Sequence, residues 1–216
     1  MKNFNRLLIL FFVFSLKGMS FCEKTYLARF DGLVDAELTL MKEHQQAKKT
    51  LLEMLQEDQD LRRQALQAGH LYNTKEAEKL SKKHIVILQT IIEKFGWPSQ
   101  EKFDEDCSFA AWTIAQHANH NIQFQKKALE YISDLNERFA LIYWIFLTDR
   151  ILANESKPQL YGTQYAKDGK LWPINDPDNL EARRKKMVLS SMDRYQDLMA
   201  QKFALIKPPS SALPLQ

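Results

Sequence analysis

Apolar residues recur at intervals of three and four along most of the chain, and this spacing predicts amphipathic α-helices. One apolar stripe runs through residues 27–41 and a second through residues 51–65, with the polar stretch EHQQAKK between them. A third stripe in residues 80–95 ends at Gly96 and Pro98, because a left-handed glycine followed by proline commonly ends a helix. The first half of the chain therefore predicts three helices.

The second half predicts further helices around one that is apolar on every side. A helix that begins in the acidic run DEDCS is expected to bend at residues 119–121 and to continue as a new helix. The segment from Phe139 to Leu147 has no polar face and is too short to span a membrane, so it predicts a buried central helix. We predict an all-α fold, a single-domain bundle of about seven or eight helices with an irregular polar loop.

Residues 1–22 differ in kind from the rest. A basic segment with Lys2 and Arg6 precedes the apolar run LLILFFVFSL, and small residues follow up to Ser20. This order of basic, apolar and small residues is typical of a secretory signal peptide. We therefore expect cleavage after Ser20 or Cys22.

Cleavage leaves a helical domain over residues 23–205 and a tail over residues 206–216, whose sequence predicts disorder. The mature protein is expected to be periplasmic or secreted, with no stable membrane anchor. The alternative is a lipid anchor on Cys22, which the bulky Phe21 before it disfavours.

The charge balance argues against a nucleic-acid partner. The leader holds three of the 30 lysines and arginines and none of the 27 acidic residues, so the remaining chain carries 27 of each. A neutral domain has no bulk electrostatic attraction to nucleic acid or to an anionic membrane. Cys107 is then the remaining cysteine, and a disulfide between Cys22 and Cys107 is the alternative if Cys22 is retained.

The stretch DRILANESKPQLYGTQY, residues 149–165, is not explained by burial of a helix face. We expect Asp149 at the end of the central helix, where a carboxylate opposes the helix dipole and needs a specific partner. Gly162 lies among polar residues that either bind a polar ligand or tie the loop to the helix ends. Asp58 and Arg62 form either an ion pair on a solvated edge or a partly buried pair with further partners.

These polar residues make up the expected ligand-binding set. Its members are Asp58, Arg62, Gln116, His120, Arg150, Gln159, Tyr161, Gly162, Thr163, Gln164 and Arg184.

His117 is the expected catalytic residue, as a general acid or base oriented by Asp149, because histidine titrates near neutral pH. His117 and His120 also have the spacing of two metal ligands on one helix, with Asp149 or Asp58 as a third. A hydrogen-bonded polar cluster is the favoured interpretation, so no metal ligand is assigned. The sequence names no cofactor, and the oligomeric state stays open.

Six stretches in order resemble an uncharacterised bacterial family, a domain of unknown function. They are DQDLR, GWP, AAWTIAQHANH, DRIL, QLYGTQ and INDPDNLEARR. Members of that family usually have an aspartate where this chain has Asn119, which weakens the case for catalysis here. The family has no established reaction, so the resemblance implies a fold and the location of a site.

Two classes of function remain. One is an exported hydrolase or transferase that uses His117. The other is a non-catalytic helical module that binds a small polar ligand or a partner protein.

Export predicts a shortened mature chain. Mass spectrometry of protein from the cell envelope or the medium should find an N-terminus near residues 20–22, because signal peptidase removes the leader. Recovery of the chain with Met1 intact in that fraction would contradict the prediction.

Overall fold

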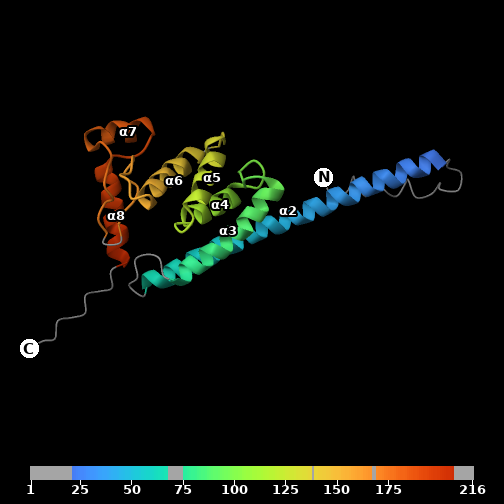
Figure 1. The fold of residues 1–216 in the computed structure, drawn as a ribbon, viewed down its shortest axis with the longest axis horizontal. Helices are drawn as coiled ribbons and strands as arrows, with labels where there is room; N and C mark the ends of the chain where they lie inside the picture. The colour runs from blue at the N-terminus through green and yellow to red at the C-terminus, as the bar shows by residue number, and fades with distance from the viewer. Residues whose placement is uncertain (1–20, 68–74, 138, 167–168, 207–216) are drawn as a thin grey trace, which may run out of the picture. The chain divides into compact units, whose positions relative to one another are not determined.

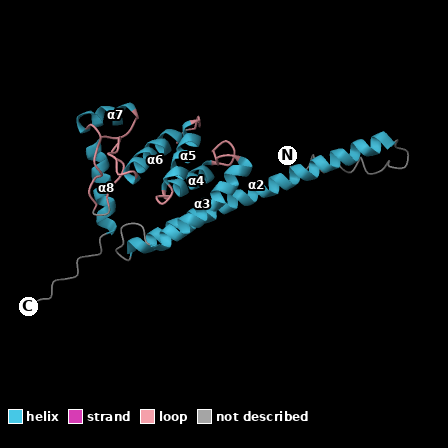
Figure 2. Cartoon of the chain, viewed as in Figure 1, coloured by secondary structure: helices cyan, strands magenta, loops and turns pink. Residues whose placement is uncertain are grey.

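The structure is a computed structural model that describes residues 21–67, 75–137, 139–166 and 169–206 (Figure 1). Within these ranges it contains seven α-helices, one 3₁₀-helix and no strand, which confirms the all-α prediction (Figure 2). The α-helices are α2 (Phe21–Gln67), α3 (Lys75–Phe95), α4 (Glu105–Gln116), α5 (Ile122–Ser133), α6 (Ala140–Asn154), α7 (Leu180–Lys186) and α8 (Met192–Ile206), and the 3₁₀-helix η1 is Pro177–Asn179. The predicted leader and tail lie mostly outside the described residues.

The chain divides into two compact units, Met1–Ala47 and Lys48–Gln216, and α2 runs through the boundary. The two helices predicted for this part are therefore one. The separating stretch EHQQAKK does not break the helix, because Glu, Gln, Ala and Lys all have high helix propensity. The side chains of residues 31–43 are exposed, Leu33 and Met41 included. None of the described helices is both long and apolar enough to cross a membrane.

The core of the second unit forms where α5 packs along α6 and α4 contacts α3, α5 and α6. Ile114 of α4, Ile132 of α5 and Leu147 of α6 are almost completely buried there. The helix α6 contains the predicted central segment but has a more exposed side, since Leu141 is 46% exposed. The helix is therefore buried on one side only, and the prediction that it is buried on every side is wrong.

Two helix ends shape the region of the site. Gly96, at φ +76°, ends α3 as predicted and donates its amide to the Ile92 carbonyl at 2.8 Å. The helix α4 ends at Gln116, and a turn leads to α5, whose N-cap Asn121 accepts the amide of Phe124 at 3.0 Å. The predicted bend at residues 119–121 is thus confirmed, and it takes the chain after His117 out of the helix.

The loop between α6 and η1 is irregular, as predicted, with isolated bridges that join Gln159 to Ile174 and Tyr165 to Leu171. Asp176 precedes Pro177 at the start of η1, but its carboxylate accepts from the side chain of Asn179 at 2.9 Å instead of capping a backbone amide. Cys107 is buried and free of a disulfide among the described residues.

Candidate functional site

Asp58 lies on the part of α2 that belongs to the second unit, and its carboxylate is the centre of a hydrogen-bond cluster. The residue is 6% exposed. The Nε atom of Arg62, one turn along the helix, donates to both carboxylate oxygens at 3.0 Å, and the amide of Gln59 donates at 3.0 Å. The ring atom Nδ1 of His117 completes the cluster at 2.8 Å. Asp58 and Arg62 are therefore the partly buried pair with further partners, and not the solvated alternative.

His117 is placed by the end of α4, of which it is the C-cap. Its backbone amide donates to the Thr113 carbonyl at 3.0 Å, and its carbonyl accepts from the Ser81 hydroxyl of α3 at 3.3 Å. The helix end thus fixes the backbone, and Asp58 fixes the ring. The imidazole remains 20% exposed.

The environment keeps His117 neutral. The pKa of His117 is lowered to about 4, chiefly by burial and also by the positive charges of Arg62 and Arg150. The hydrogen bond to Asp58 acts in the opposite direction and raises the pKa. Burial alone would raise the pKa of Asp58, but its contacts with His117 and Arg62 lower it to about 2. At neutral pH the ionised Asp58 therefore accepts a hydrogen bond from Nδ1–H, and Nε2 carries the lone pair.

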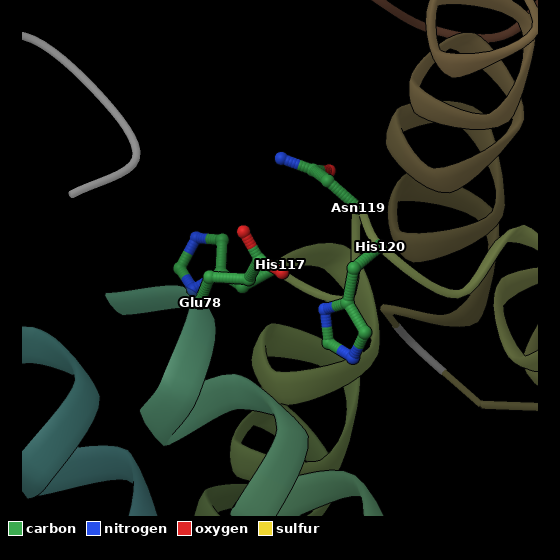
Figure 3. A pocket seen from close by; sticks show the side chains of 4 residues that line it. All are labelled: Glu78, His117, Asn119 and His120. Carbon is green, nitrogen blue, oxygen red and sulfur yellow. The ribbon is translucent and has the colours of Figure 1, made fainter. Parts of the chain in front are cut away.

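His117 opens onto a cavity of about 160 Å³, which is lined by Glu78, His117, Asn119 and His120 (Figure 3). The oxygen of the Asn119 amide accepts from Asn154 at 3.2 Å, which leaves its nitrogen without a partner among the described residues. The carboxylate of Glu78 is paired with Lys82 at 2.6 Å. Partial burial and the charge of Lys82 lower the pKa of His120. The cavity wall is therefore polar and carries two imidazoles.

His117 and His120 do not share a helix, because α4 ends before His117 and His120 lies in the turn that follows. The spacing that suggests two metal ligands is therefore not realised as a helical pair. Within the described ranges, no group of three His, Cys, Asp or Glu side chains is placed to hold a metal ion.

Asp149 belongs to a different network. It lies inside α6, more than a turn before the helix ends at Asn154, so the predicted position at the helix end is wrong. The residue is completely buried. Its oxygens accept the backbone amides of Leu160 at 2.7 Å, Tyr161 at 3.1 Å and Thr163 at 3.0 Å, and the Thr163 hydroxyl at 2.9 Å. Burial raises the pKa of Asp149, and these hydrogen bonds oppose that shift.

The carbonyls of the same loop are bound by two arginines of α7. Arg183 donates through Nε to the Leu160 carbonyl at 3.0 Å. Arg184 donates to the carbonyls of Tyr161 and Ser190 and lies over the ring of Tyr195. Arg184 is 2% exposed, so its guanidinium is an internal support of the loop, where the sequence suggested a ligand-binding residue.

The polar side chains of the loop are also bound within the protein. The Gln159 amide donates to the carbonyls of Gln164 and Trp172 at 3.0 and 2.8 Å and accepts the Gln164 backbone amide at 2.8 Å. Gly162, at φ +75°, lies where a Cβ atom would come within 2.8 Å of the Met192 sulfur. The loop thus ties α6, α7 and α8 together, which is the second of the two roles considered for it.

The expected site residues therefore fall into two groups. His117 bonds to Asp58, whereas the oxygens of Asp149 bind the loop, so the two residues expected to act as a pair lie in different hydrogen-bond networks. Gln116 donates to the Phe146 carbonyl at 3.4 Å and joins α4 to α6. Sequence reasoning missed Glu78, which shows only as one acidic residue on a solvated helix face.

The sequence pattern of a family of unknown function (DUF6624) matches residues 45–207, a range that includes both networks. No curated protein and no solved structure matches the chain.

The Asp149 network predicts a large loss of stability in Asp149→Asn. The amide NH₂ group cannot accept the loop amides, so the free energy of unfolding should fall by about 3 kcal/mol. Chemical denaturation measures this change. The control Asp197→Asn alters an exposed aspartate of α8 and should leave stability unchanged. Equal stability of the two variants would contradict the role given to Asp149.

Proposed function

This chain belongs to the family of unknown function DUF6624, and we propose that it is an exported enzyme, a hydrolase or transferase, in which His117 is the general base. The observation that carries the proposal is the 2.8 Å contact between His117 Nδ1 and the buried carboxylate of Asp58. A carboxylate on one ring nitrogen fixes the tautomer and orientation of an imidazole whose other nitrogen acts on substrate.

The mechanism uses the two ring nitrogens differently. Because Nδ1–H is bonded to Asp58, Nε2 is the atom that takes a proton from a water or a substrate hydroxyl as that oxygen attacks. The imidazolium that forms is stabilised by the adjacent Asp58 carboxylate. It then returns the proton to the leaving group, which restores neutral His117. Asp58 thus takes the orienting role that the sequence suggested for Asp149.

The composition of the cavity wall favours an activated water or substrate hydroxyl as the nucleophile. The lining residues Glu78, His117, Asn119 and His120 include no serine, threonine or cysteine. A protein hydroxyl or thiol that His117 could activate as a nucleophile is therefore not among the lining residues. Direct attack by the deprotonated oxygen is therefore the simpler reaction for this site.

The alternative is a non-catalytic module that binds a small polar ligand or a partner protein. Asn119 favours it, because a neutral amide neither takes nor gives a proton at neutral pH. Export rests on the leader sequence, and an exported protein would meet its ligand outside the cytoplasm.

The enzyme proposal is tested with His117→Gln on a panel of chromogenic esters, phosphoesters and glycosides. The variant should lower kcat/KM by about 10²–10⁴-fold with little change in melting temperature, because it removes the base and no core packing. The control His44→Gln, in the first unit, should retain activity.

The pH profile gives a second readout. A general base must be unprotonated, and the pKa of His117 in the free enzyme is about 4, so kcat/KM should fall only as the pH drops towards 4. Turnover that does not depend on His117 would contradict the proposal.

A further inference from the structure

We infer that this site binds an oxyanion, a phosphate or carboxylate group of the substrate, through the guanidinium group of Arg62 beside the Asp58–His117 pair. The description of the oxyanion as part of a substrate rests on the proposed function. The binding itself is separate from turnover and is measurable without a known substrate.

The hydrogen bond to Asp58 fixes the orientation of the Arg62 guanidinium group. The bond uses Nε alone, at 3.0 Å from both carboxylate oxygens. The two terminal nitrogens of Arg62 have no partner among the described residues, and the side chain is 21% exposed. A guanidinium held at Nε loses little freedom when its terminal nitrogens bind two oxygens of a phosphate or carboxylate.

The charged groups near His117 also favour an anionic ligand. Arg62 and Arg150 both act on the imidazole as positive charges, and Asp58 is the carboxylate bonded to it. The acidic residue of the cavity wall, Glu78, is paired with Lys82 at 2.6 Å. An anion at His117 therefore lies near the positive charges of Arg62 and Arg150, and the acidic residue of the cavity wall already has a cation.

Asn119 supplies a neutral donor at the cavity. Its oxygen accepts from Asn154 at 3.2 Å, so the amide nitrogen is the end left for a ligand, and in Figure 3 that nitrogen points to the side on which His117 lies. An aspartate here would place a negative charge on the wall and repel an anion. Asparagine carries no charge and supplies a hydrogen-bond donor, which suits an oxyanion.

Bound oxyanion also assists the base. A negative charge within hydrogen-bonding range of an imidazole stabilises its protonated form and raises its pKa. Substrate binding would therefore raise the pKa of His117 from its value of about 4 towards that of an effective base at neutral pH. The pKa of His117 is therefore raised only while the anion is bound.

The test follows histidine-ring and arginine Nε–H signals by NMR in the full chain at pH 7, with inorganic phosphate or acetate added at constant ionic strength. We expect saturable shifts at His117 and Arg62. Saturation by phosphate alone assigns a phosphoryl group, saturation by acetate alone assigns a carboxylate, and either supports the inference. Absence of saturation by both anions would overturn it.

Neighbouring arginines provide a matched control. Arg62→Gln should weaken binding at least about tenfold, since one bidentate charge-assisted contact is lost. Arg63→Gln should leave binding unchanged, because Arg63 is exposed and bonds to Asp60 at 2.7 Å. Arg62→Lys keeps a charge beside Asp58 and lacks the planar fork, so it should also bind more weakly if Arg62→Gln fails to fold. Equal binding in Arg62→Lys and Arg63→Gln would contradict the inference.

His117→Gln separates this inference from the proposed enzyme. If the variant binds anion but the wild type shows no His117-dependent turnover, the enzyme proposal fails and the oxyanion site stands. If turnover depends on His117 but neither anion binds, the oxyanion site fails and the enzyme proposal stands.

Discussion

The buried carboxylate of Asp149 is the constraint on which the C-terminal half of the second unit depends. A carboxylate without partners inside a protein is very costly, and so are unpaired backbone amides. Each group supplies the partner that the other lacks, because three backbone amides and one hydroxyl of residues 160–163 donate hydrogen bonds to the Asp149 carboxylate. Arg183 and Arg184 bind the carbonyls of Leu160 and Tyr161 in the same loop. The loop backbone is thereby held between a negative and two positive charges.

The loop network differs in character from the Asp58–His117 pair. The motif residues Asp149, Gln159 and Arg184 are all buried and are bound to loop backbone. The Asp58–His117 pair has the opposite character, with one ring nitrogen fixed and the ring at the edge of a polar cavity. A rigid surrounding fold of this kind is what a base needs to keep its geometry. The loop is bound to Asp149 of α6, the helix that also carries Arg150.

The sequence predicts the helices where local rules dominate. The end of α3 at Gly96 and the turn before α5 follow from residue types that act on their own neighbours. The prediction of two helices in place of α2 is wrong. The apolar stripe stops in the polar stretch EHQQAKK, but the residues there still favour a helix, so the helix continues through that stretch. Asp149 does have specific partners, although the reason given from the helix end is wrong. The bond between Asp58 and His117 joins residues 59 apart in the chain, and no local pattern encodes that pairing.

The function proposed for this site requires that His117 is a neutral imidazole with its proton on Nδ1, held by Asp58. Nitrogen-15 NMR of the histidine rings over a pH titration tests it most directly, because it reports both the tautomer and the pKa of each ring. We predict a ring protonated on Nδ1 at neutral pH that titrates near pH 4. A His117 ring that titrates near pH 6.5, as a solvated histidine does, or that carries its proton on Nε2, would contradict the account.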